Sequence, residues 1–183
     1  MAAAGTQPQW GGDEPALRPF NVRRDLEAVL DFQYEVYEGN FPGFCVDRSF
    51  REEYGRDLRR AARDSREALM VLEQDDELCG FIWAALMSTL VDARVGYIKN
   101  VYIAAHLRGS GHAQRLMAAV EQWLLDQGAD KIMLDASTCN PRALAFYEKL
   151  GYDVERVRMV KRLAPGESPD QRARERMRTR GTE

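Results

Sequence analysis

The most informative stretch of the sequence is VYIAAHLRGSGHA, residues 101–113. An apolar segment ends there, a turn containing Gly109 and Gly111 follows, and apolar residues then recur at helical spacing, at Ala113, Leu116, Met117, Val120 and Leu124. The free amides and partial positive charge of that helix N-terminus must lie at the turn. Arg108 adds a charged guanidinium that can bind a phosphate oxygen in two places. The sequence therefore predicts a strand, a turn and a helix arranged to hold phosphate.

Two common nucleotide motifs do not account for this turn. It is not a Walker loop, because no Gly-Lys-Ser/Thr ends it. It does not match the dinucleotide fingerprint either, since no third glycine follows in register and the acidic residues downstream, Asp130 and Asp135, are poorly placed to bind a ribose. Taken alone, the turn is also compatible with a purely structural role.

A second informative stretch, NPRALAFYEKLGY, covers residues 140–152. Asn140 is a good N-cap, Pro141 suits the first position of a helix, and Gly151 suits the left-handed residue that closes one. Ala143, Tyr147 and Leu150 fall on one face of the predicted helix.

Outward from these motifs, the pattern predicts a mixed α/β fold (α+β in its arrangement). Strands are expected at residues 16–20, 68–73, 79–87, 94–103, 131–135 and 152–160, and helices over Leu26 to Tyr37, 109–127 and 141–150. A further helix is expected to start at a capping box formed by Ser49 and Glu52, after an aromatic loop, residues 39–46, kinked at Pro42. The middle strands predict an antiparallel meander, and the later alternation of helix and strand allows parallel pairing.

Composition fits one soluble domain. The chain has 183 residues, 45% of them hydrophobic and 30% charged, with a formal net charge of -3, which excludes wholesale disorder. No apolar run is long enough to cross a bilayer, and the N-terminus does not resemble a secretory signal, so a cytoplasmic location is expected. We expect residues 1–14 and 164–183 to be disordered tails, the latter basic, around a domain at residues 15–163. The acidic remainder argues against nucleic acid as a partner.

Cysteine and histidine usage predicts neither disulfides nor a metal. Cys45, Cys79 and Cys139 lie far apart, and His106 and His112 have no acidic or thiol ligand nearby in the sequence. Cys139 lies beside Asn140, but nothing in the sequence indicates the base that a reactive thiol needs. A covalent acetyl-cysteine route is therefore not favoured.

Together, the two motifs resemble the GNAT superfamily of acetyl-CoA-dependent N-acetyltransferases. The family pattern of Arg or Gln, two residues, Gly, one residue, and Gly or Ala stands here as Arg108, Gly109, Ser110, Gly111, His112 and Ala113. The downstream family pattern stands as Asn140, Ala143, Tyr147, Gly151 and Tyr152. The resemblance extends over about residues 15–163, and its specific part lies between Tyr97 and Tyr152.

The resemblance implies a GNAT-like fold in which a parallel pair of strands, the fourth and fifth, splays around acetyl-CoA. The pyrophosphate would lie on residues 109–113, and the pantetheine would run beside Val101, Tyr102 and Ile103. The Val101 amide would contact the oxyanion, Asn140 would reach the pantetheine or its waters, and Tyr147 would give a proton to the departing thiolate as general acid. The resemblance also implies that Ala143 contacts the cofactor.

The general base is where the sequence departs from the family. Many members carry an acidic residue on the strand before the motif, whereas this chain reads Tyr97, Ile98, Lys99, Asn100, Val101. Other candidates are Asp135, Glu38, and a relay through Tyr97 or Tyr102. The sequence does not choose among them.

The resemblance places the acceptor pocket mainly at residues 39–46. The candidate acceptor contacts are aromatic or acidic and suit a cationic amine: Tyr37, Glu38, Phe41, Phe44 and Asp135. We expect an acetyltransferase acting on a primary amine of a small molecule or peptide, by direct attack in a ternary complex, with a homodimer possible. The alternatives are a non-catalytic acyl-CoA binding or sensing module, and a protein N-terminal or lysine acetyltransferase.

Overall fold

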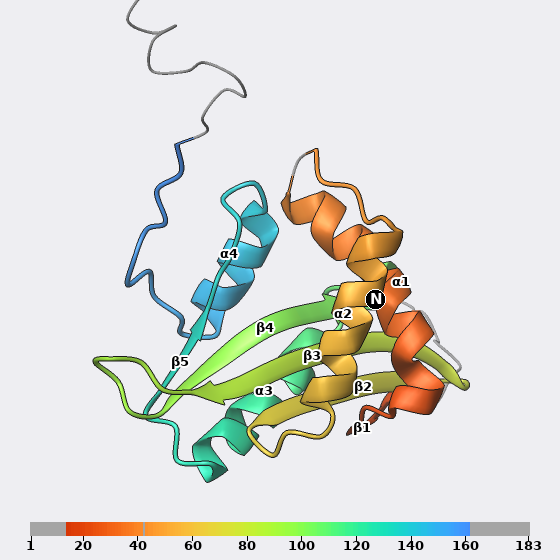
Figure 1. Ribbon diagram of the computed structural model, residues 1–183, viewed down its shortest axis with the longest axis horizontal. Helices are drawn as coiled ribbons and strands as arrows, with labels where there is room; N and C mark the ends of the chain where they lie inside the picture. Colours follow the sequence, from red (N-terminus) through yellow and green to blue (C-terminus); the bar gives the residue numbers. More distant parts are fainter. Residues whose placement is uncertain (1–13, 42, 162–183) are drawn as a thin grey trace, which may run out of the picture. The chain divides into compact units, whose positions relative to one another are not determined.

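The computed structural model describes residues 14–41 and 43–161, and their chain divides into two units that meet between Gly151 and Tyr152. All regular elements lie in the first unit (Figure 1). They are β1 (Ala16–Pro19), α1 (Val22–Asn40), α2 (Arg48–Ala61), β2 (Glu67–Gln74), β3 (Glu77–Met87), β4 (Val95–Ile103), the 3-10 turn η1 (Ala105–Leu107), α3 (His112–Asp126), β5 (Lys131–Leu134) and α4 (Pro141–Lys149). The predicted tails and Pro42 fall almost wholly outside the described residues.

The sheet has the strand order β1-β2-β3-β4-β5. The first four strands are antiparallel neighbours, and β5 pairs in parallel with β4. Asp75 and Asp76, which connect β2 to β3, both have positive φ angles of 51° and 63°, as a tight two-residue hairpin requires. The predicted meander followed by a parallel pair is confirmed.

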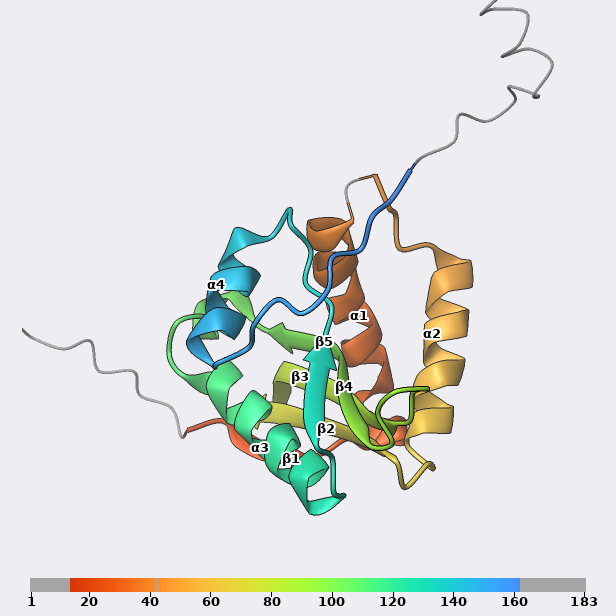
Figure 2. The ribbon, with the colours of Figure 1, turned by 90° about the vertical axis from the view of Figure 1, so that its left-hand side faces the viewer.

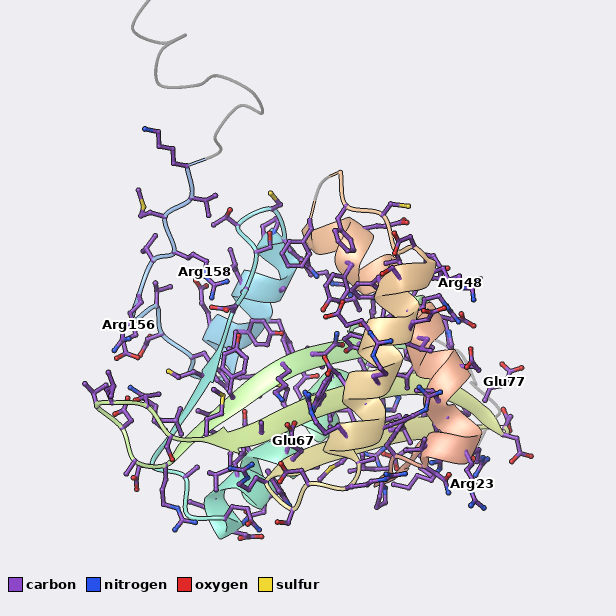
Figure 3. The ribbon with its side chains drawn as sticks, in the orientation of Figure 1. Arg23, Arg48, Glu67, Glu77, Arg156 and Arg158 are labelled. Atoms are coloured by element: carbon purple, nitrogen blue, oxygen red, sulfur yellow. The ribbon has the colours of Figure 1, made fainter. Side chains whose placement is uncertain are left out.

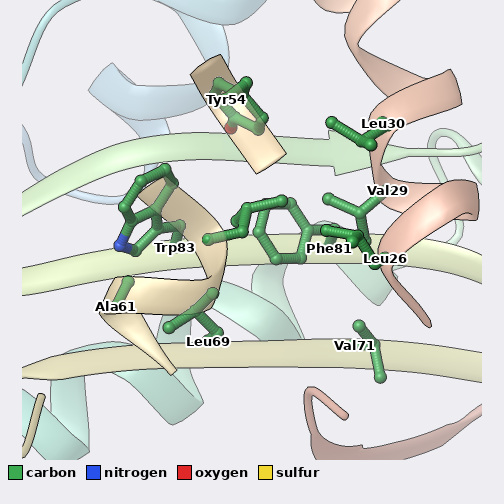
Figure 4. Packing of buried hydrophobic residues seen from close by; sticks show 10 residues of the cluster. Leu26, Val29, Leu30, Tyr54, Ala61, Leu69, Val71, Phe81 and Trp83 are labelled. Atoms are coloured by element: carbon green, nitrogen blue, oxygen red, sulfur yellow. The ribbon is translucent and has the colours of Figure 1, made fainter. Parts of the chain in front are cut away.

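Helices cover both faces of this sheet. α3 packs on one face and α1 and α2 on the other, which Figure 2 shows with the sheet turned on edge. On the α3 side the contact is close, since a Cβ at Gly96 of β4 would lie 2.5 Å from Leu124 Cδ1. On the other side, apolar residues of α1 and α2 meet Leu69, Val71, Phe81 and Trp83 of the sheet (Figure 4). Burial of each large apolar side chain contributes about 1.5–3 kcal/mol.

The predicted start of α2 is wrong. Asp47, not Ser49, caps the helix, and its Oδ1 accepts a hydrogen bond from the Phe50 amide at 2.8 Å. Glu52 pairs instead with Arg48, at 2.8 Å. Aspartate is one of the strongest N-caps, and its position two residues earlier lets the helix start sooner.

The predicted strand at residues 152–160 is also absent. Residues 152–161 have no regular secondary structure, and Val154, Val157 and Met159 are exposed. The apolar residues alternate from Tyr152 to Val154, but the next apolar residue is three positions on, at Val157. A single strand face needs a period of two, and this change of phase breaks it.

Candidate active site

The sheet opens between β4 and β5. Only Val95–Ile98 of β4 pair with β5, opposite Lys131–Leu134, while β4 continues to Ile103 against β3. Ala104 donates its amide to Cys79 O at 2.9 Å, so by alternation Val101 and Ile103 point their N–H and C=O groups the other way, into the opening. The predicted splay of the fourth and fifth strands is therefore present, with Val101 at its edge.

A β-bulge lies just before this edge. Asn100 pairs with Trp83 and Ile98 with Ala84, which leaves Lys99 as the extra residue. Lys99 bonds Glu67 at 2.8 Å and lies 4.5 Å from the centre of the Trp83 ring, while Asn100 donates to Gln33 Oε1 of α1 at 2.8 Å. The bulge and these partners connect β4 to β2, β3 and α1 where the strand leaves β5.

The glycine turn before α3 has open space at both of its glycines. Gly109 and Gly111 have φ angles of 86° and 92°, and a Cβ at either position would meet nothing within 4 Å. Of the four α-helices described, α3 is the one without a side-chain cap. In addition, His112 Nδ1 is buried with no hydrogen-bond partner among the described residues. Unsatisfied donors at a helix N-terminus fit a phosphate group.

Arg108 braces this turn in the structure. Its Nε donates to Ile103 O at 2.9 Å, and its guanidinium pairs with Glu35 of α1. Tyr102 donates its hydroxyl to the same carboxylate at 3.1 Å. Burial raises the pKa of Tyr102, and Glu35 raises it further, so the phenol stays protonated and can donate this hydrogen bond. Sequence reasoning missed Glu35, since nothing local marks a helix residue that pairs 67 and 73 positions away.

The second motif connects α4 to α1. Asn140 Oδ1 accepts a hydrogen bond from the Ala143 amide at 3.0 Å, which confirms it as the cap of α4, and its Nδ2 donates to Asn40 Oδ1 at 3.1 Å. Asn40 was not a predicted site residue. Tyr147 lies further along α4, and burial raises its pKa to about 12.

Three of the predicted acceptor residues lie together. The Tyr37 ring centre is 5.5 Å from that of Phe41 and 5.6 Å from that of Phe44. Phe41 and Phe44 are 54% and 41% exposed, so their rings are accessible to an acceptor. Tyr37 also packs on Phe50 and so belongs in part to the core. Burial raises the pKa of Tyr37. Glu38 is exposed on the same helix.

Asp135 lies at a different place, where β5 ends. Its Oδ2 accepts a hydrogen bond from the Tyr97 hydroxyl at 2.8 Å. Tyr97 pairs with Met133 in register, before the two strands separate after Ile98 and Leu134. Two of the base candidates are thus in contact at the narrow end of the opening.

A sheet opened beside a glycine turn and an uncapped helix defines an acyltransferase type of domain, and comparisons with known proteins agree. Residues 28–152 match the model of the Acetyltransferase (GNAT) family. Mycothiol acetyltransferase of Kocuria rhizophila is 30% identical over 141 residues, 75% of this chain and 45% of that protein. Mycothiol acetyltransferase of Salinispora tropica is 35% identical over 92 residues, 49% of this chain and 29% of that one. This chain therefore spans less than half the length of these curated relatives.

Solved structures show the same fold. The aminoglycoside N-acetyltransferase AAC(6')-Iy, solved in complex with CoA, superimposes with a TM-score of 0.67 over 86% of this chain and 99% of that chain, at 20% sequence identity. The chain belongs to the GNAT family of acetyltransferases. No helix in the described residues is both long and apolar enough to span a membrane.

Proposed function

We propose that the protein transfers the acetyl group of acetyl-CoA to a primary amine of a small molecule or peptide, by direct attack in a ternary complex. The observation that carries the proposal is the uncapped N-terminus of α3 beside the half of β4 that β5 leaves unpaired. Family membership supports acetyl transfer. Relatives named for mycothiol and aminoglycosides support a small-molecule acceptor.

The residues that would hold the cofactor follow from the glycine turn and the open edge of β4. The amides of residues 109–113 would bind the pyrophosphate, and the edge of β4 from Val101 to Ile103 would hydrogen-bond the pantetheine. Arg108 would hold the turn in place and offer its remaining N–H groups, while Asn140, Ala143 and Tyr147 would line the α4 side. Bound acetyl-CoA supplies an activated thioester.

The chain's own groups then perform three tasks. The Val101 N–H, which points into the opening, would donate to the carbonyl oxygen as negative charge develops there. Tyr147 would donate to the departing sulfur, because a pKa of about 12 keeps its phenol protonated at neutral pH. Among the base candidates, the Tyr97–Asp135 pair is favoured by its place where β4 and β5 separate. Asp135 would accept the proton that the amine loses.

Calorimetry with acetyl-CoA tests the cofactor site. Gly111→Glu places a carboxylate where the pyrophosphate would lie, so binding should fall by at least about a hundredfold. Gly111→Ala introduces the same backbone strain without the charge, and Ala118→Glu adds the same charge on the exposed side of α3. Gly111→Ala should bind more tightly than Gly111→Glu, and Ala118→Glu should bind like the parent.

Turnover is tested by thiol release from acetyl-CoA in the presence of aminoglycosides, polyamines and peptide amines. Release that depends on one of these acceptors supports an enzyme and names its acceptor class. Tight binding with no release for any amine would support the acyl-CoA sensing alternative, and absence of binding by the parent would refute the cofactor site.

A further inference from the structure

A basic hollow lies on the outer side of α2. It has a volume of about 570 Å³ and is lined by four arginines and one acidic residue: Arg56, Arg59, Arg60, Arg63 and Asp64. A second hollow, of about 540 Å³, shares Arg56 and Arg59 with the first, but its other charged lining residues are paired, Arg48 with Glu52 and Arg51 with Glu27, and it also contains Leu30 and Tyr34. Arg48 projects from the start of α2 in Figure 3. We call the first hollow, with its four arginines, the α2 arginine surface.

Three of the arginines in the first hollow form no ion pair with another described residue. Within the described residues, Arg56, Arg59 and Arg63 form no ion pair, whereas Arg60 pairs with Asp57 at 2.9 Å and Asp64 is held by Arg66 at 3.1 Å. All four arginines of the first hollow are exposed.

The spacing of these arginines brings like charges together at the C-terminal end of α2. Arg56 is three residues from Arg59 and four from Arg60, so these like charges repel on the helix surface, while Glu52 and Glu53 in the preceding turn offset part of the repulsion at Arg56. One or two cations near a helix C-terminus complement its dipole, but Arg59 and Arg60 already fill that role in the last turn. An anion bound across Arg56, Arg59 and Arg63 would remove the repulsion.

The surface is separate from the proposed cofactor site. α2 covers the face of the sheet opposite α3, whose N-terminus carries the glycine turn (Figure 2). The basic character is also local, because residues 161–183 hold seven basic and four acidic residues and the other 160 carry a formal net charge of -6. A partner must therefore be anionic over a short span.

Geometry favours an extended acidic peptide. Alternate side chains of an extended chain point the same way about 6.7 Å apart. Residues three or four apart on a helix are about 4.5–6 Å apart along its axis, which is the order of this repeat for Arg56 and Arg59, and Arg63 follows in the turn after α2. Single-stranded nucleic acid is bound through stacking on aromatic rings, and the first hollow contains none. A longer polyanion would also meet the acidic remainder of the domain.

We propose that the α2 arginine surface docks an acidic peptide segment of a partner protein, whose alternate Asp or Glu carboxylates pair with Arg56, Arg59 and Arg63. This function does not depend on the proposed acetyl transfer. Arginine is suited to it, since its planar fork binds a carboxylate through two parallel hydrogen bonds.

Fluorescence anisotropy tests the docking with the full chain and a labelled peptide of alternating Glu and Ser, about twelve residues long. The parent should bind at about 0.05 M salt and more weakly at about 0.3 M. Arg59→Gln/Arg63→Gln should weaken binding about tenfold. The matched control, Arg23→Gln/Lys149→Gln, removes the same charge from exposed positions on α1 and α4 and should change affinity less than about twofold.

Thermal melting of each variant first checks that it is folded. Absence of peptide binding by the parent, or an equal loss in the control variant, would overturn the proposal. An oligothymidylate of the same charge serves as competitor, and if it displaces the peptide at lower concentration than unlabelled peptide does, the surface binds nucleic acid instead. Acetyl-CoA binding, measured in parallel, reports on the other site alone.

Discussion

Tyr147 shows how one residue's surroundings set its role. Burial raises its pKa to about 12, so the phenol stays protonated at any physiological pH. A thiol has a reference pKa of about 8.5, so full proton transfer from Tyr147 to the thiolate is uphill at these values. We therefore expect the hydroxyl to stabilise the departing sulfur chiefly as a hydrogen-bond donor.

Tyr147→Phe removes this donor and keeps the ring. The value of kcat should fall by about a hundredfold, since loss of one hydrogen-bond donor to developing negative charge costs at least about that much, while the Kd for acetyl-CoA stays within about twofold. Steady-state kinetics and calorimetry together measure the two quantities. A variant as fast as the parent would remove Tyr147 from the mechanism.

The sequence predicted some site residues better than others for a physical reason. Gly109, Gly111 and Asn140 act through the local backbone, and turn and cap chemistry is legible from neighbouring residues. Glu35 and Asn40 act through partners on distant segments, Tyr102 and Asn140, so no local pattern marks them. The pairing of Asp135 with Tyr97 likewise depends on the parallel register of β4 and β5.

At the scale of elements, helix positions were predicted more reliably than their exact starts. The apolar stripe of α1 was predicted, and its Leu26, Val29 and Leu30 are buried. The Lys99 bulge was not predicted, because an extra residue in a mostly apolar strand leaves no gap in the pattern. The strand expected at residues 152–160 is absent. That segment is rich in apolar residues, but their alternation breaks after Val154, so apolar content alone was a misleading signal.

The start of α2 offers a direct test. Asp47→Ala should lower the free energy of unfolding by about 1 kcal/mol, because the Phe50 amide loses its acceptor. Ser49→Ala, inside the helix and exposed, should change it by less than about 0.5 kcal/mol. Urea denaturation measures both, and the reverse order of effects would restore Ser49 as the cap.

At the scale of the whole domain, one ionic network connects β1, α1 and β2. Arg18 donates to Asp25 at 2.7 and 2.8 Å and to Glu73 at 2.6 Å, and the Asn21 amide also donates to Asp25. Burial alone would raise the pKa of Asp25, but the hydrogen bonds from Arg18 and Asn21 outweigh it, and the pKa is lowered. The Arg18 hydrogen bond also lowers the pKa of Glu73.

A lowered carboxyl pKa stabilises the fold above its unfolded value of about 3.9, and this contribution disappears as pH falls through the folded value. Asp25→Asn should cost about 3 kcal/mol at neutral pH, since it leaves Arg18 without a charged partner in α1. The difference from the parent should shrink near pH 3. Urea unfolding at both pH values measures it, with Asp31→Asn as an exposed ion-pair control expected to change stability by less than about 1 kcal/mol. A pH-independent difference would contradict the assignment.

The short pairing of β5 also determines where the domain opens first. β5 has four residues, all partly exposed, and α4 has no fully buried side chain, whereas α3 buries Leu116, Met117, Val120 and Leu124. Segments with little buried apolar surface open locally at a lower free energy than the whole domain. We therefore expect β5 and α4 to open locally before the antiparallel strands do. The β5 and α4 side of the opening is thus expected to be less stable than the β4 side.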